Sequence, residues 1–209
     1  MKEKIGVAVL VSGGGTNLQA LIDAAAAGRM PACELCAVIS SRPDAYALVR
    51  AREAGIRAEV VSRREHPGQA DFEGRIRAIL DSCGAEVIVL AGFLSILSED
   101  FTRAYPERIL NVHPSLIPAF CGKGYYGLRV HEEALARGVK ITGATVHFVN
   151  EVPDGGRIIL QKAVRVKRND TPETLQKRVM REAEWKLLPA ATQTVCAELL
   201  RRRKNERNK

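Results

Sequence analysis

Asn111 and His113 are the residues whose types and spacing best suit chemistry, and they stand at the end of the apolar segment 108–112. Residues two apart on a β-strand point to the same side, so both side chains can face one cleft. An asparagine N–H can stabilise an oxyanion, and a histidine can accept or donate a proton near neutral pH. The pair therefore indicates a reaction in which negative charge develops on an oxygen. A structural role for both residues is the alternative.

A glycine-rich loop at 12–15 leads into the predicted helix 16–27. Glycines let a backbone approach a ligand closely, and the start of a helix favours an anion. No Gly-Lys-Ser/Thr follows as in a Walker loop, and Leu18 stands where the dinucleotide fingerprint needs its third glycine. The loop therefore predicts a site for a single phosphate, with a merely tight turn as the alternative.

Asp154 stands before two glycines in the turn 150–156, where a carboxylate can swing toward a ligand or hold a histidine. An ordinary turn aspartate is the alternative. Among the other histidines, His147 is expected in the core or behind the site, His131 exposed or capping a helix, and His66 in a surface loop. No nucleophile elbow of the G-x-S-x-G type is present, and we expect no metal site.

Composition argues for an ordinary globular protein, with 46% hydrophobic residues in 209 and no apolar run of membrane-spanning length. The net charge is +8, but residues 201–209 contribute +5 of it, so the chain is expected to be a single domain over 1–200 with a basic, disordered tail over 201–209. Five scattered cysteines and no signal peptide favour reduced thiols and a cytoplasmic location. We expect no nucleic-acid or membrane partner, and a monomer or homodimer.

The elements that must position these residues alternate between strand and helix in the first half of the chain. Apolar strands are expected at 5–11, 35–39, 57–61 and 86–91, with helices at 16–27, 44–54 and 70–82 between them. This alternation is typical of a parallel, doubly wound, Rossmann-like sheet.

The second half of the chain has a different pattern. A short strand at 108–112 precedes a loop at 114–127 and a helix at 132–137. Two partly alternating segments, 142–149 and 157–166, predict an antiparallel pair that extends the sheet. A helix begins at Thr171 and Pro172 and continues toward the tail, with a break expected at Pro189. The fold class is α/β, with antiparallel strands added to a parallel half.

Taken together, four segments resemble the folate-dependent phosphoribosylglycinamide formyltransferases over roughly residues 5–195. They are VSGGGTNLQA (11–20), LAGFLSIL (90–97), NVHPSLIP (111–118) and GATVHFV (143–149) followed by Asp154-Gly155-Gly156. The resemblance implies a Rossmann-like formyltransferase fold and formyl transfer from the co-substrate 10-formyltetrahydrofolate to 5′-phosphoribosylglycinamide, in de novo purine biosynthesis. It implies no metal.

The same resemblance implies roles for individual residues. Asn111, His113 and Asp154 would be catalytic. The substrate phosphate would lie on Gly15, Thr16 and Asn17, and Glu184 would hold the ribose hydroxyls. The folate would contact the catalytic Asn111 and two further segments: Leu94, Ser95, Ile96 and Leu97, and the loop Asn150, Glu151, Val152, Pro153 and Asp154.

The chain departs from the family pattern at several places. Some members carry arginine at Ser95, and a folate-binding arginine near residue 69 is matched only by Gln69. The loop 120–127 is longer than in the shortest members and is a candidate lid. One residue is inserted between Val179 and Glu184.

Other functions fit parts of the pattern. A methionyl-tRNA formyltransferase would need an RNA-binding domain, for which 209 residues leave no room. A formyltetrahydrofolate hydrolase would not need the phosphate loop. A non-enzymatic nucleotide- or RNA-binding module would not need His113, and its RNA binding would depend on salt and on residues 201–209.

Overall fold

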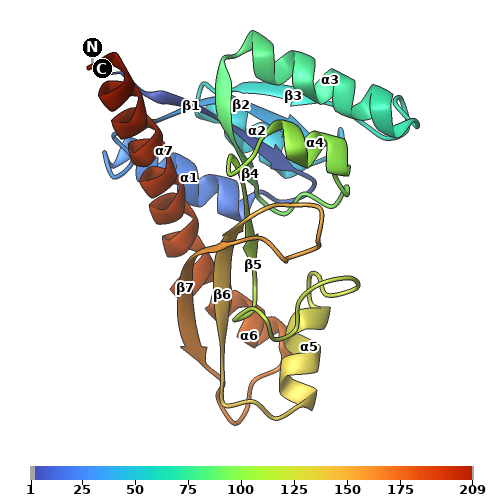
Figure 1. Ribbon diagram of the computed structural model, residues 1–209. Coiled ribbons are helices and arrows are strands. Elements are labelled where there is room, and N and C mark those ends of the chain that lie inside the picture. The colour runs from blue at the N-terminus through green and yellow to red at the C-terminus, as the bar shows by residue number, and fades with distance from the viewer. Residues whose placement is uncertain (1–2, 209) are drawn as a thin grey trace.

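The computed structural model describes residues 3–208 and contains one seven-stranded sheet in the order β3-β2-β1-β4-β5-β6-β7 (Figure 1). The strands are β1 (Ile5–Val11), β2 (Cys33–Ser40), β3 (Arg57–Val60), β4 (Ala85–Leu90), β5 (Ile109–His113), β6 (Ile141–Phe148) and β7 (Ile158–Arg165). Neighbouring strands are parallel from β3 through β2, β1 and β4 to β5, whereas the pairs β5–β6 and β6–β7 are antiparallel. The predicted fold, a parallel half extended by antiparallel strands, is confirmed.

Helices cover both faces of the sheet. They are α1 (Thr16–Ala26), α2 (Tyr46–Glu53), α3 (Gln69–Ser82), α4 (Glu99–Ala104), α5 (Arg129–Ala136), α6 (Pro172–Val179), the π-helical turn η1 (Met180–Glu184) and α7 (Trp185–Arg207). Val7 and Val9 of β1 face the core beneath α1 and α7, whereas Ala8 and Leu10 face the core beneath α3. Successive residues of β1 are thus buried on alternate faces of the sheet. Because both faces are covered, every position of the strand is apolar.

The sheet has its switch point between β1 and β4, because the chain winds outward from β1 in both directions. Open α/β sheets bind ligands beyond the carboxyl ends of their strands at such a point. The glycine loop follows β1 there, and Asn111 and His113 end β5, which lies on the other side of β4. The topology therefore brings both candidate segments to one edge of the sheet.

The structure differs from the sequence prediction in three helices, one of which is α5, which spans Arg129–Ala136 rather than 132–137. The helix α4 was not predicted, although Ser98 caps it by accepting a hydrogen bond from Phe101 N–H. Pro189 does not break α7, which runs through it to Arg207.

Residues 201–207 are helical, so the expectation of a disordered tail is wrong for them. Arg203 pairs with Glu86, and Arg207 lies 3.1 Å from Glu3, which holds the end of α7 beside the start of the chain (Figure 1). The basic residues therefore continue a helix whose earlier turns are buried, rather than forming an independent segment.

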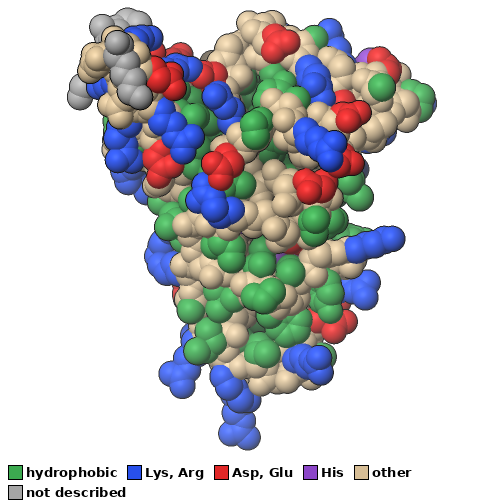
Figure 2. Space-filling view, in the orientation of Figure 1, with side chains coloured by type: hydrophobic (Ala, Val, Ile, Leu, Met, Phe, Trp, Pro, Cys, Tyr) green, Lys and Arg blue, Asp and Glu red, His purple; other side chains and the backbone are tan. Residues whose placement is uncertain are grey.

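Side chains of different types gather on different parts of the surface. Figure 2 shows charged side chains over the part that contains the parallel strands, and hydrophobic ones over β6 and β7. Ile141 and Ile158 of these strands are among the exposed large apolar residues. No helix in residues 3–208 is both long enough and apolar enough to span a bilayer.

Candidate active site

The strand β5 presents Asn111 and His113 at its carboxyl end, as predicted. Its antiparallel partner β6 sets Asn111 opposite His147 and His113 opposite Thr145. His113 and His147 are buried, while Asn111 is half-buried. The Nδ2 atom of Asn111 lies 3.3 Å from Nε2 of His147. Strand pairing therefore adds a second imidazole to the expected site.

Asp154 reaches this pair from the loop that follows β6. Its Oδ2 lies 3.5 Å from Nδ1 of His113, and its Oδ1 lies 3.5 Å from Nε2 of His147. Gly122 of the 120–127 loop also donates its N–H to Oδ2, at 2.8 Å. Asp154 has a left-handed backbone with φ of 56°. The structure thus gathers Asn111, His113 and Asp154, which the sequence could only nominate separately.

The electrostatics of the cluster favour a carboxylate beside an imidazole that is neutral at rest. Burial lowers the pKa of His113, and the nearby Asp154 charge only partly offsets this. Burial would raise the pKa of Asp154, but contacts with His147, the Gly122 N–H and His113 together hold that pKa below its ordinary value. The Nε2 of His113 donates to the carbonyl of Phe120 at 2.8 Å, which leaves Nδ1 facing the carboxylate. A proton taken up by His113 would therefore form an ion pair with Asp154.

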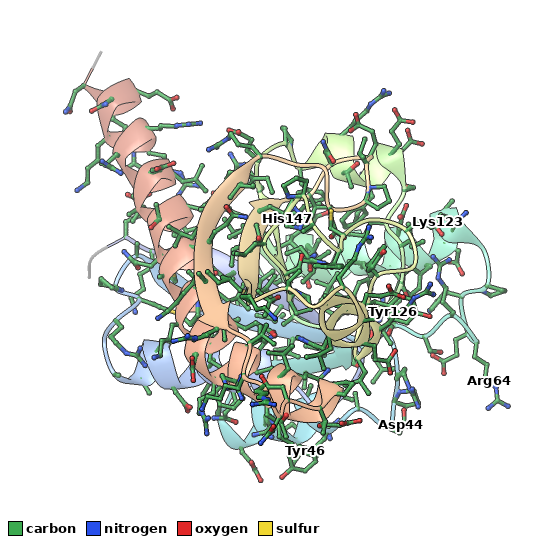
Figure 3. All side chains as sticks on the ribbon, turned by 90° about the horizontal axis from the view of Figure 1, so that it is seen from below. Asp44, Tyr46, Arg64, Lys123, Tyr126 and His147 are labelled. Atoms are coloured by element: carbon green, nitrogen blue, oxygen red, sulfur yellow. The ribbon has the colours of Figure 1, made fainter. Side chains whose placement is uncertain are left out.

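The loops around the cluster are visible in Figure 3, where His147 lies centrally and Lys123 and Tyr126 of the 120–127 loop lie to one side. Phe120 and Gly122 attach this loop to His113 and Asp154. Within residues 3–208, no three His, Cys, Asp or Glu side chains group as metal ligands.

His131 was expected to be exposed or capping, and this is wrong. It is fully buried, and neither ring nitrogen has a hydrogen-bond partner. Burial, followed by the proximity of His113, lowers its pKa to about 4. The reason is that α5 turns His131 inward against the sheet side of the helix, together with Val130 and Ala134.

We expect His131 to weaken the protein in acid. Its imidazole stays neutral in the folded chain to about pH 4, whereas the unfolded chain takes up this proton below about pH 6.5. Above pH 6.5 the neutral ring therefore costs the folded protein no stability. At pH 5 the free energy of unfolding should be lower by about 2 kcal/mol. Urea unfolding at pH 7 and pH 5 measures the loss, which His131→Leu should lack. A control, His66→Gln, should keep it, and equal pH dependence in all three proteins would refute the assignment.

The glycine loop has the geometry of an anion site. Gly15 has φ of 72°, and a Cβ there would lie only 2.7 Å from Cβ of Ala47, so glycine is required. Gly13 and Gly14 are exposed at the start of α1. Their backbone and the N-terminal N–H groups of α1 can therefore face a bound phosphate.

Asn17 and Glu184 meet beside this loop, although 167 positions separate them. Asn17 Nδ2 donates to Glu184 Oε2 at 2.7 Å, and both side chains are buried. Asn17 Oδ1 has no partner. Burial raises the pKa of Glu184 to about 7, with Asn17 acting in the opposite direction. The pair therefore joins the first turn of α1 to the end of η1.

A π-helical turn, η1, ends at Glu184, in the segment where the resemblance implies an inserted residue. It spans Met180–Glu184 between α6 and α7. A π turn accommodates one more residue than an α turn, and such turns are frequent at functional sites. At the end of this turn, Glu184 accepts a hydrogen bond from Asn17.

The segment 94–97 lies in the loop between β4 and α4, close to the glycine loop. Ser12 Oγ accepts the N–H of Leu94 at 2.9 Å. Leu94 and Ile96 are 65% and 81% exposed. Val152, in the 150–154 loop, is 54% exposed. Gln69 binds the carbonyl of Ile96 at 3.1 Å.

Both the fold and the site define a class of protein. The chain belongs to the formyl transferase family, whose sequence profile matches residues 5–192. Among its relatives is the phosphoribosylglycinamide formyltransferase of Haemophilus influenzae, 43% identical over 88% of this chain and 83% of that protein. The trifunctional purine biosynthetic protein adenosine-3 of Bos taurus is 43% identical over 98% of this chain, which spans only 20% of that protein.

Solved structures agree with the fold. Glycinamide ribonucleotide transformylase 1 from Symbiobacterium toebii has 40% identity and a TM-score of 0.87, over 95% of this chain and 90% of that one. A formyltetrahydrofolate deformylase from Pseudomonas syringae has 26% identity and a TM-score of 0.82, over 94% of this chain and 62% of that one. The fold is thus shared with both a transformylase and a deformylase.

Proposed function

We propose that the chain transfers the formyl group of 10-formyltetrahydrofolate to the amine of 5′-phosphoribosylglycinamide. The observation that carries this proposal is the convergence of Asn111, His113 and Asp154 at the sheet edge that also bears the glycine loop. The relative from Haemophilus influenzae, which matches over most of both chains, supports the choice of reaction.

Two segments would hold the ribonucleotide. The backbone at Gly15, Thr16 and Asn17 would bind its phosphate, because the loop starts a helix and has no Cβ at its closest point. Glu184, held by Asn17, would accept hydrogen bonds from the ribose hydroxyls.

The folate would lie against exposed apolar side chains of two loops. Its pterin would contact the segment Leu94, Ser95, Ile96 and Leu97 and the loop Asn150, Glu151, Val152, Pro153 and Asp154. The exposure of Leu94, Ile96 and Val152 supports this placement.

Chemistry would begin when the amine attacks the formyl carbon and negative charge develops on the formyl oxygen. Asn111 would donate a hydrogen bond to that oxygen. His113 is neutral at rest, so it would add positive charge only once it takes up the proton that the amine loses, and it makes no second direct bond because its Nε2 is engaged by Phe120. The proton lost by the amine would pass to the His113–Asp154 pair and then to N10 of the folate as the carbon–N10 bond breaks. No metal or covalent enzyme intermediate is needed.

A deformylation assay tests the proposal. The protein is mixed with 10-formyltetrahydrofolate, and release of the folate is followed optically with and without 5′-phosphoribosylglycinamide. Turnover only with the ribonucleotide supports the transferase. Equal turnover in its absence would instead support a hydrolase, as in the structurally similar deformylase. Turnover in neither tube would exclude this donor.

Replacing Glu184 should weaken ribonucleotide binding selectively. A lost hydrogen bond to a charged group costs about 1.5–3 kcal/mol, so Glu184→Ala should raise the ribonucleotide KM about 10- to 100-fold. The folate KM should change little. Because the pKa of Glu184 is about 7, the wild-type ribonucleotide KM should also rise as pH falls below 7. Glu182→Gln, on the same turn, is the control, and an unchanged KM in Glu184→Ala would contradict the assignment.

A further inference from the structure

We infer that Glu73 is a positioning residue that anchors the loop 94–98 and so prepares it to bind the folate. The inference deepens the proposed function and rests on it, since that proposal places the pterin against this loop. Glu73 lies in α3 and is only 4% exposed. A carboxylate is costly to bury unless hydrogen bonds satisfy it. Its hydrogen-bond partners therefore indicate what the side chain does.

Three neutral donors satisfy the two carboxylate oxygens of Glu73. Oε1 accepts the backbone N–H of Ser98 and the side-chain amide of Gln69, each at 2.6 Å. Oε2 accepts the hydroxyl group of Ser98 at 2.6 Å. Two of the donors thus belong to the residue at which the loop ends and α4 begins. Glu73 therefore ties the end of the loop to α3, which lies beside α4 (Figure 1).

This contact supplies a hydrogen bond that α4 cannot make for itself. In a capping box, a Glu or Gln at the third helical position accepts the N–H of the N-cap residue. Ser98 is the N-cap of α4, and its third helical position is Phe101, whose side chain has no acceptor. Glu73 provides the missing acceptor from another helix. A carboxylate at the start of a helix is also favourable electrostatically.

Gln69 extends the anchor from Glu73 to the middle of the loop. Its Nε2, which donates to Glu73, also donates to the carbonyl oxygen of Ile96 at 3.1 Å. At the other end of the loop, Ser12 accepts the N–H of Leu94 at 2.9 Å. The loop backbone is thus held at both ends and in the middle, while the side chains of Leu94 and Ile96 stay exposed. A loop that is ordered in advance loses less affinity to ordering on binding.

Two substitutions of Glu73 separate anchoring from packing. Glutamine has nearly the same shape, and its oxygen can accept the N–H groups of Ser98 and Gln69 while its amide donates to the Ser98 hydroxyl oxygen. Methionine fills a similar volume but is only a weak acceptor.

The two Michaelis constants should respond differently to these substitutions. Ordering two free side chains on binding costs about 5- to 100-fold in affinity, so Glu73→Met should raise the folate KM by about that factor. The ribonucleotide KM should stay unchanged, and Glu73→Gln should keep both values close to wild type. Asp71→Asn, at an exposed position of the same helix, is the control and should also match wild type. Thermal unfolding would confirm that each variant is folded.

Hydrogen exchange of the protein without substrates tests the anchor itself. The Leu94 N–H is bonded to Ser12 and not to Glu73, so its exchange reports the order of the loop rather than the loss of its own acceptor. In Glu73→Met this amide should exchange faster than in wild type, whereas the amides of 74–82 in α3 should stay protected. Glu73→Gln should match wild type in both segments. Unchanged exchange of Leu94 in Glu73→Met would overturn the inference, and so would lost protection throughout α3.

Kinetics and exchange together distinguish failure of this inference from failure of the proposed function. The anchor would be overturned if Glu73→Met raised both KM values equally, or if Glu73→Met and Glu73→Gln raised the folate KM alike. A wild-type protein that transfers no formyl group would count against the proposed function. The exchange of Leu94 in Glu73→Met would then support or overturn the anchor by itself.

Discussion

Asn111→Ala is expected to lower kcat by about 10²- to 10³-fold, the usual cost of removing an oxyanion donor. Asn111 is half-buried at the end of β5, where a charge-stabilising N–H is shielded from bulk water. Both KM values should change little, because the hydrogen bond gains most of its strength only as charge develops on the formyl oxygen.

Steady-state kinetics with both substrates varied would measure this loss. Asn205→Ala, at an exposed position of α7, provides a control that should retain wild-type rates. Thermal unfolding would confirm that Asn111→Ala remains folded. Near-normal turnover of the folded variant would exclude Asn111 as the oxyanion donor.

Asp154→Asn is the second change with a large expected effect, because proton transfer by a positioned group contributes about 10²- to 10⁴-fold. Asparagine keeps an oxygen to accept the Gly122 N–H, so the 120–127 loop can stay attached. What is lost is the charge that stabilises protonated His113. A fall in kcat within that range is expected.

The pH profile distinguishes this electrostatic role from simple disruption. The Asp154 charge raises the pKa of His113 against the effect of burial, so removing that charge should lower the pKa further. The acid limb of kcat/KM, where His113 becomes protonated, should move to lower pH in Asp154→Asn. Asp44→Asn, which alters only an exposed pair with Arg42, should leave the limb in place. An unmoved limb in Asp154→Asn would rule out the His113–Asp154 pair as the titrating unit.

Much of the architecture follows from local sequence. The run Ile5–Val11 is apolar at every position, which is what burial on both faces of a parallel strand requires. Thr171 and Pro172 start α6 with the predicted cap. The helix α4 was missed because it has only six residues and too few turns to show a periodic pattern.

Local spacing was enough to predict that Asn111 and His113 share a face, because strand geometry repeats every two residues, and that a glycine loop opens a helix. The distant groups that join them could be identified only from the fold. Asp154 comes from another loop, and Glu184 meets Asn17 across 167 positions. The burial of His131 likewise depends on how α5 packs. Contacts of this range arise from strand order and helix packing, which no local spacing encodes.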